Sequence, residues 1–86
     1  MTFKEITNER NTTHGDFAEN ARISQRLKAV MRRDDYTPVQ QEAIDMICLK
    51  LSRIASGHAG YDDHWKDIGG YAQLVIDEII NSNLSP

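Results

Sequence analysis

Residues 50–74 read KLSRIASGHAGYDDHWKDIGGYAQL, and the rest of the chain is organised around this stretch. The glycines in its segment 57–60 predict a turn between two helices, because glycine readily ends a helix. In an antiparallel pair of helices, facing residues have a nearly constant sum of residue numbers. By this rule the facing pairs, with sums of 117 and 116, are Lys50 with Asp67 and Arg53 with Asp63. The stretch therefore predicts a helical hairpin in which two cations face two carboxylates.

The chain has 86 residues, of which 40% are hydrophobic and 27% are charged, and its formal net charge is −3. This length predicts a single domain, 1–86, with a core small enough to favour self-association. The negative charge disfavours binding to duplex nucleic acid, which proteins usually contact through basic surfaces. The single cysteine, Cys48, fits a buried structural thiol in a reducing compartment. Because the sequence shows no signal-peptide pattern and no apolar run of membrane-spanning length, we expect a cytoplasmic protein without a membrane contact.

Apolar residues recur at helical spacing in three segments, and no segment shows the alternation typical of strands. The predicted helices span 17–33, 38–56 and 63–81, and a short helix is predicted near the N-terminus. Their start signals are an acidic cap at Asp16 and a capping box that begins at Thr37. We therefore expect an all-α fold, a small bundle of three main helices whose last two form an antiparallel hairpin.

The last helix has two unusual features. Gly69 and Gly70 lie in its interior, where two glycines cost about 2 kcal/mol relative to two alanines. Such a pair predicts a tight helix crossing or the close approach of a ligand to the backbone. The segment 74–80 is also more apolar than one side of a small bundle requires, and this predicts a homo-oligomer formed through the C-terminal helix.

The charged hairpin has two interpretations. Its residues form interhelical ion pairs that fix the register, or they form a binding site. In a site, Lys50 and Arg53 would bind phosphate, Arg53 through its planar fork. Asp63 and Asp67 would hold a hard cation such as Mg²⁺, and Glu42 with Asp45, three residues apart, adds a further carboxylate pair.

Other residues with ligand-binding chemistry lie outside the hairpin pairs. His14 belongs to a turn before the first main helix, and Asp16 and Asn20, one helical turn apart, can converge on one ligand atom. Trp65 and Tyr71 offer aromatic surfaces that can stack on a base, although a Trp in this position also serves as a core anchor. No glycine-rich phosphate loop, nucleophile elbow or Cys/His cluster is present.

Three segments together resemble small phage and prophage all-α proteins of unassigned function. They are HGDFAEN at 14–20, DMICLKLSRIASG at 45–57 and DDHWKDIGGYAQL at 62–74. Their order is also similar, more loosely, to nucleotide modification associated domain 1, which occurs near nucleotide-modifying enzymes in phages. That resemblance directs attention to these residues: His14, Gly15, Asp16, Asn20, Asp45, Lys50, Arg53, Asp63, Asp67 and Tyr71.

A more distant similarity is to the MazG-type all-α nucleoside triphosphate pyrophosphatases. Those enzymes hold Mg²⁺ with an E-E-x-x-E helix and an E-x-x-D helix. Here Glu42 and Asp45 match the second motif, whereas the helix that should carry the first offers Glu19 alone. The metal motif is thus incomplete, and the sequence leaves open whether the protein is an enzyme.

Three functional hypotheses follow. The first is a phage-type protein, in the cytoplasm of a bacterial host, that binds a nucleotide or nucleotide-derived phosphate ligand at His14, Asp16, Asn20, Lys50, Arg53, Trp65 and Tyr71. It would serve nucleotide metabolism or sequester a defence signal. The second is a non-enzymatic interaction module or an inhibitor of a host protein. The third is a weak Mg²⁺-dependent nucleotide hydrolase that uses Glu42, Asp45, Asp63 and Asp67, with the metal held by Asp45, Asp63 and Asp67.

Overall fold

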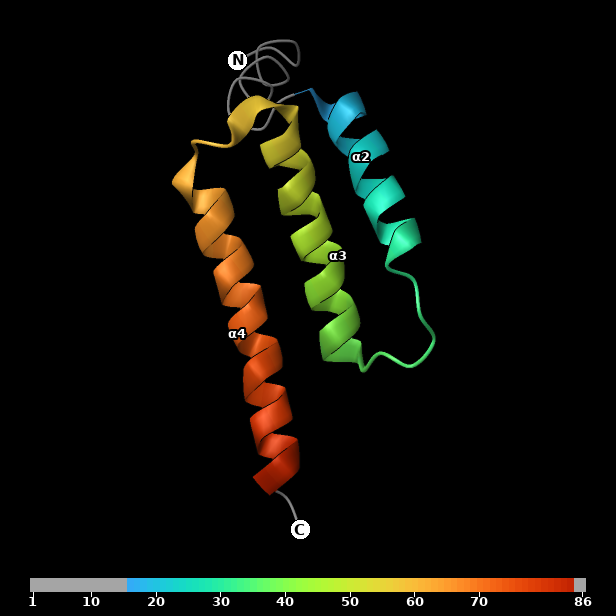
Figure 1. The fold of residues 1–86 in the computed structure, drawn as a ribbon, viewed down its shortest axis with the longest axis vertical. Coiled ribbons are helices and arrows are strands. Elements are labelled where there is room, and N and C mark those ends of the chain that lie inside the picture. The colour runs from blue at the N-terminus through green and yellow to red at the C-terminus, as the bar shows by residue number, and fades with distance from the viewer. Residues whose placement is uncertain (1–15, 85–86) are drawn as a thin grey trace, which may run out of the picture.

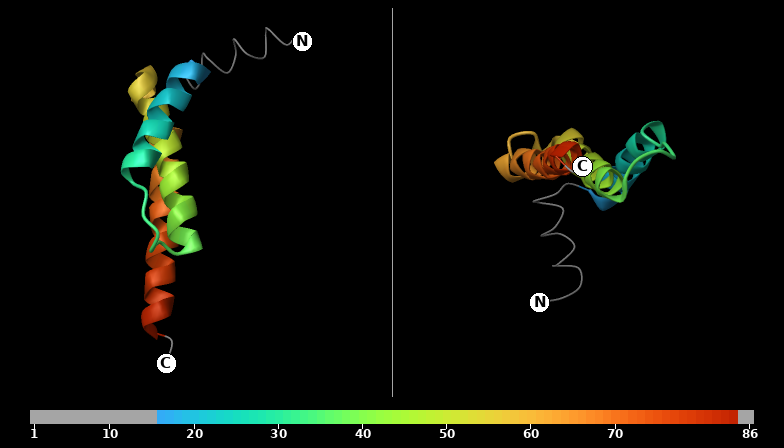
Figure 2. Two further views of the ribbon diagram at one scale, coloured as in Figure 1. Left: turned by 90° about the vertical axis from the view of Figure 1, so that its right-hand side faces the viewer. Right: turned by 90° about the horizontal axis from the view of Figure 1, so that it is seen from below.

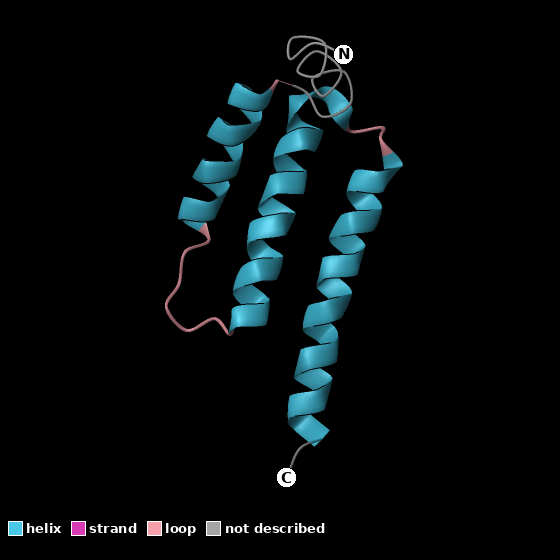
Figure 3. Ribbon diagram, turned by 180° about the vertical axis from the view of Figure 1, so that it is seen from behind, coloured by secondary structure: helices cyan, strands magenta, loops and turns pink. Residues whose placement is uncertain are grey.

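The computed structural model describes residues 16–84, and the short helix expected near the N-terminus lies outside this range. Along the chain, the helices are α2 (Phe17–Val30), α3 (Pro38–Arg53), the π-helical turn η1 (Ile54–His58) and α4 (Asp62–Leu84). Helices and loops account for all of these described residues, without a strand (Figure 3). The all-α class and the three main helices are thus confirmed.

The predicted start signals cap two helices as expected. Asp16 caps α2, since its carboxylate accepts a hydrogen bond from the Glu19 backbone N–H at 3.3 Å. At α3, the Thr37 hydroxyl accepts from the Gln40 N–H at 3.1 Å, and the Thr37 N–H donates to the Gln40 side chain at 3.0 Å. This reciprocal pair is a complete capping box, and it satisfies backbone groups that a helix start otherwise leaves unpaired.

Two of the helices are shorter than predicted. α2 ends at Val30, and the loop after it is held by an Arg33–Asp35 ion pair of 2.9 Å and by the Tyr36 hydroxyl, which donates to the Met31 carbonyl. α3 ends at Arg53, after which the backbone widens into η1. Gly57 then adopts a φ of 111°, a left-handed conformation that glycine tolerates. The turn lies where the sequence predicts it.

The hairpin of α3 and α4 has the expected register. The Lys50 ammonium lies 2.7 Å from the Asp67 carboxylate, and the Thr37 hydroxyl donates to the Glu78 carboxylate at 2.6 Å. The residue numbers of these two pairs sum to 117 and 115. Contacts at both ends of α3 therefore fix the alignment of the two helices.

The three helices lie side by side in one layer (Figure 1; Figure 2, right). α3 is central and packs against both α2 and α4, which have no comparable contact with each other. A single layer cannot enclose a core, because a domain normally buries apolar residues between two layers. Accordingly, within residues 16–83 the only buried hydrophobic residues are Ala43 and Cys48. The burial predicted for the Cys48 thiol is confirmed, and it raises the pKa of that thiol.

The two sides of the layer differ in chemistry. Contacts place Lys50, Asp67 and the residues of a groove between α3 and α4 on one side, which we call the charged side. A helix turns by about 100° per residue. On α3 and α4 this spacing directs a set of apolar residues to the opposite, apolar side: Ile44, Leu51, Trp65, Ile76 and Ile79. The charged side and the apolar side of α3 and α4 thus consist of different residues.

The tight crossing predicted at Gly69 and Gly70 is wrong for the described chain. Both residues are exposed, and a Cβ atom built on either would meet no atom within 4 Å. The reason is that, among the described helices, α4 packs mainly against α3, and these glycines point away from that contact. None of the helices in residues 16–84 combines the length and apolarity needed to cross a membrane.

Candidate functional site

Most of the predicted site residues gather at one end of the layer, which we call the loop end. Because neighbouring helices are antiparallel, the start of α2, the end of α3 and the start of α4 all lie there (Figure 1). Asp16 and Asn20 belong to the first of these segments, Arg53 to the second and Asp63 to the third. The structure thus brings together residues that are far apart in the sequence, while His14 lies outside the described residues.

Lys50 and Asp67 form an ion pair on the charged side near this end. The Lys50 side chain is only 12% exposed, whereas the Asp67 side chain is 45% exposed. The hydrogen bond from Lys50 lowers the pKa of Asp67, and the charges of Lys50, His64 and Arg53 act in the same direction. Asp67 therefore stays ionised and holds a largely buried ammonium in place.

Arg53 is not paired as the sequence predicts. Among the described residues no carboxylate lies within 4.0 Å of its guanidinium, so the expected ion pair with Asp63 is absent. α3 ends at Arg53 and the backbone widens, so the hairpin register does not continue to Asp63. Asp63 instead raises the pKa of Tyr61 through its charge and a hydrogen bond. Arg53, a partly buried residue, thus has no carboxylate partner among the described residues and lies one helical turn after Lys50.

A group of buried polar residues lies between the helices near the loop end, namely Asn20, Ser24, Ser52 and His64. The Ser52 hydroxyl donates to the Leu49 carbonyl at 2.6 Å, and the His64 ring packs 4.9 Å from the Tyr61 ring. Neither serine is among the site residues that the sequence predicts. The available signal was their position among residues that face a neighbouring helix, where a small side chain permits close contact.

Asp16 and Asn20 do not converge on a common outer ligand. Asp16 is exposed, and its carboxylate caps the first turn of α2. Asn20 is buried, with only 5% of its surface exposed. A shared role in ligand binding therefore finds no support in their geometry.

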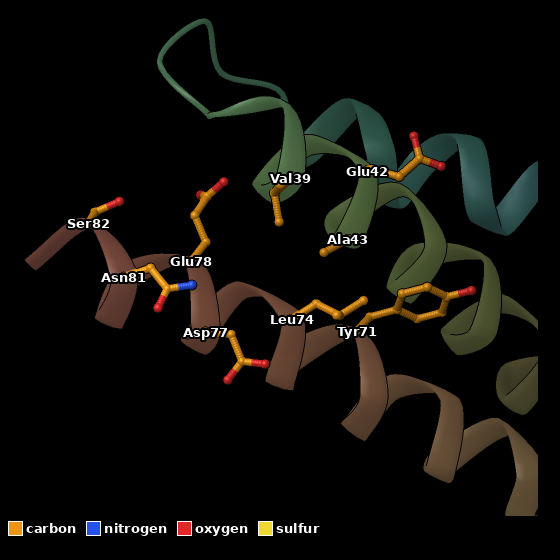
Figure 4. Close-up of a pocket in the computed structure, with 9 residues that line it drawn as sticks. All are labelled: Val39, Glu42, Ala43, Tyr71, Leu74, Asp77, Glu78, Asn81 and Ser82. Atoms are coloured by element: carbon orange, nitrogen blue, oxygen red, sulfur yellow. The ribbon is translucent and has the colours of Figure 1, made fainter. Parts of the chain in front are cut away.

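A groove of about 600 Å³ lies between α3 and α4 on the charged side (Figure 4). Its apolar lining consists of Val39, Ala43, Tyr71 and Leu74, and its acidic lining of Glu42, Asp77 and Glu78. Tyr71 follows Asp67 by one helical turn, so the groove begins next to the Lys50–Asp67 pair. Of the two aromatic residues in the predicted site, Tyr71 is the one that the structure places beside these charges.

Trp65 lies on the other side of the layer. Its indole N–H donates to the Ala59 carbonyl at 2.8 Å, which holds the ring against the turn, and the residue is 52% exposed. Because Trp65 and Asp67 are two residues apart on a helix, their side chains point about 200° apart. Trp65 therefore cannot stack on a ligand that sits between Lys50 and Tyr71.

The metal site expected at Asp45, Asp63 and Asp67 is not formed. In the part of the chain that the structure describes, no three His, Cys, Asp or Glu side chains are arranged to hold a metal ion. Asp45 accepts a hydrogen bond from the Gln41 amide, and Asp67 is engaged by Lys50. By the hairpin register, Asp45 lies about 13 Å along the helix axis from Asp63. The three carboxylates are thus too far apart to share an ion.

Comparison with known proteins identifies a family. Residues 2–79 match the family model described as Domain of unknown function (DUF6378). No curated protein and no solved structure shows significant similarity to the chain. The resemblance to nucleotide modification associated domain 1 and to MazG-type enzymes stays a prediction. Since the match covers almost the whole sequence, the chain belongs to the DUF6378 family.

Proposed function

We propose that the protein binds a nucleotide or a nucleotide-derived phosphate ligand on its charged side. One observation carries the proposal. Beside a lysine whose position is held by Asp67, Arg53 has no carboxylate partner among the described residues. An arginine fork with open donors next to a second cation is suited to a phosphate group.

The phosphate end of this site is preorganised. Lys50 is held by Asp67 at 2.7 Å, so little side-chain freedom remains to be lost when an anion binds. Lys50 and Arg53 together bring two positive charges against the one carboxylate of Asp67. Two cations held next to each other on α3 can contact one phosphate group together.

The groove provides the second half of the site. From Asp67 to Leu74 the distance along α4 is about 10 Å, comparable to the length of a mononucleotide. Tyr71 and Leu74 offer apolar surface to a base, and the carboxylates of Glu42 and Asp77 can accept hydrogen bonds from its amino groups. A ligand with a phosphate at Lys50 and Arg53 would thus place its base in the groove.

Gly70 fits the same arrangement. It lies three residues after Asp67 and four before Leu74, on the charged side of α4, and its position is open. A glycine here leaves the helix backbone bare where the ligand would cross from the cations to the groove. This is the ligand interpretation of the glycine pair, and it replaces the tight crossing.

The contacts of Lys50, Arg53 and Tyr71 support ligand binding, and the proposal concerns binding alone. Together with the resemblance to phage proteins and to nucleotide modification associated domain 1, this favours a role in nucleotide metabolism or in sequestering a nucleotide signal. We also propose that the protein self-associates through α4, because Ile76, Ile79 and Ile80 are about half exposed on it.

The test is a thermal-shift screen of nucleoside mono-, di- and triphosphates and cyclic dinucleotides, followed by titration calorimetry with the best ligand. Arg53→Lys keeps the charge but loses the fork, so we expect affinity to fall about tenfold or more with little change in stability. Arg22→Lys, on α2, is the matched control and should bind like the wild type. If no nucleotide raises the melting temperature, or if Arg53→Lys binds as tightly as the wild type, the proposed site is wrong.

A further inference from the structure

The groove between α3 and α4 carries hydrogen-bond acceptors around its apolar lining (Figure 4). Three carboxylates belong to that lining, Glu42 on α3 and Asp77 and Glu78 on α4, and none of the described residues that line the groove is a lysine or an arginine. An ionised carboxylate accepts hydrogen bonds and donates none. A base in this groove is therefore selected by the donors that it carries on its edge.

The three carboxylates differ in the contacts that they already make. Asp77 accepts a hydrogen bond from the Gln73 amide at 2.8 Å, and Glu78 accepts one from the Thr37 hydroxyl at 2.6 Å. The Glu42 carboxylate has no hydrogen bond or ion pair with the rest of the described chain, and the residue is exposed. Both oxygens of Glu42 are thus available to a ligand.

Glu42 lies where the proposed site puts the base. The numbers of Glu42 and Leu74 sum to 116, between the sums for the two contacts that fix the hairpin register, so these residues face each other across the groove. Along α3, Glu42 lies eight residues from Lys50, which corresponds to about 12 Å. A purine nucleotide has about this length, so a phosphate at Lys50 would leave the edge of the base at Glu42.

The common bases differ in what they offer to a carboxylate. Guanine presents two adjacent donors, its N1–H and its 2-amino group, which match the two oxygens of one carboxylate. Adenine and cytosine present an amino group beside a bare ring nitrogen, and uracil and thymine present one N–H between two carbonyl oxygens. For those four bases an acceptor would lie against a carboxylate oxygen and be repelled. Paired hydrogen bonds to a charged acceptor, which guanine alone can form here, are also the stronger kind.

We infer that the groove selects guanine, whose N1–H and 2-amino group donate to the two oxygens of Glu42 while its ring packs against Tyr71 and Leu74. The inference rests on the proposed nucleotide site and names its class of ligand, a guanine nucleotide. The groove volume of about 600 Å³ is within the range of small-molecule sites and accommodates a purine.

Titration calorimetry of the full chain tests the choice of base. The ligands are the 5′-monophosphates of guanosine, inosine, adenosine, cytidine and uridine, which share one phosphate and differ at the base. Guanosine monophosphate should bind most tightly. Inosine monophosphate lacks only the 2-amino group and should bind about tenfold more weakly, because it loses one hydrogen bond to a charged acceptor. Equal affinity for these two ligands, or tighter binding of any of the other three, would overturn the inference.

The variant Glu42→Gln tests the residue that reads the base. The amide keeps one acceptor and gains a donor, a pair that matches the 6-amino group and N1 of adenine. Because Glu42 is exposed, the substitution should leave the melting temperature nearly unchanged. We expect the affinity for guanosine monophosphate to fall about tenfold or more, so that adenosine monophosphate binds at least as tightly.

Glu19→Gln is the matched control, since it makes the same change at an exposed position of α2. It should keep the preference for guanine. A preference for guanine that persists in Glu42→Gln at its wild-type strength contradicts the inference.

The guanine inference and the proposed nucleotide site fail in different ways. If all five monophosphates bind alike and Arg53→Lys weakens them all, the phosphate site stands and the guanine inference is wrong. If none of the five binds, the guanine inference is wrong. The nucleotide site itself is wrong if no ligand of the thermal-shift screen binds either.

Discussion

The charged and apolar sides of α3 and α4 are built from the same two helices and have opposite properties. On the charged side, Asp67 holds Lys50 in place, while Arg53 has no carboxylate partner within the described part of the chain. On the apolar side, Leu51 and Ile76 are exposed with no described helix above them. The difference shows how two helices can present a charged side and an apolar side, because residues two apart on a helix point to nearly opposite sides.

The largest effect on stability is expected at Ser52, which lies between packed helices at the boundary of the charged and apolar sides. Ser52 is 0% exposed, so Ser52→Leu should force neighbouring helices apart and cost about 1–3 kcal/mol of unfolding free energy. Urea denaturation measures the loss. Ala18→Leu, at an exposed position of α2, is the control and should stay within about 0.5 kcal/mol of the wild type. An unchanged midpoint for Ser52→Leu would mean that the helices are loosely packed and the two sides are not separated.

A smaller effect, of opposite sign, is expected at the two glycines of α4. Gly69→Ala and Gly70→Ala should each stabilise the protein by about 0.5–1 kcal/mol, because both lie inside a helix and a Cβ would meet open space. The two variants also test whether a ligand binds on the charged side of the layer. Once a nucleotide ligand is known, Gly70→Ala should weaken its binding and Gly69→Ala should not. Equal binding by both variants would remove Gly70 from the site.

The smallest effect concerns the Lys50–Asp67 ion pair and its dependence on pH. The folded-state pKa of Asp67 is below its ordinary value, so the pair contributes stability above that value and loses the contribution as the pH falls through the folded-state pKa. Thermal unfolding of the wild type and Asp67→Asn should therefore differ most near neutral pH and converge in acid, below about pH 4. If the difference in melting temperature between the wild type and Asp67→Asn stays constant from neutral pH to below about pH 4, Asp67 acts through packing and not through its charge.

Much of the fold could be predicted because it depends on local rules. The caps at Asp16 and Thr37 and the stop at Gly57 are set by hydrogen bonding and backbone sterics within a few residues. The Lys50–Asp67 pair followed from counting along two helices of regular pitch. The Arg53–Asp63 pair failed at the point where that regularity ends, since a π-helical turn is not visible in a pattern of residue types.

The candidate site shows the same division. The sequence identified Lys50, Arg53 and Tyr71 from their chemistry, and the structure places all three along the same pair of helices. It could not show that Trp65 points to the other side or that Ser24 and Ser52 are buried. Both facts depend on which helix packs against which, and no single helix carries that information.

The sequence by itself determined where the helices begin and turn, the register of the hairpin and the residue types on each helical face, because these follow from helix pitch and local hydrogen bonds. Only the tertiary structure decided that the three helices form one layer, that Gly69 and Gly70 face open space and that Arg53 has no carboxylate partner among the described residues. Those outcomes depend on contacts between segments distant in the chain, where small shifts in packing decide which side chains meet.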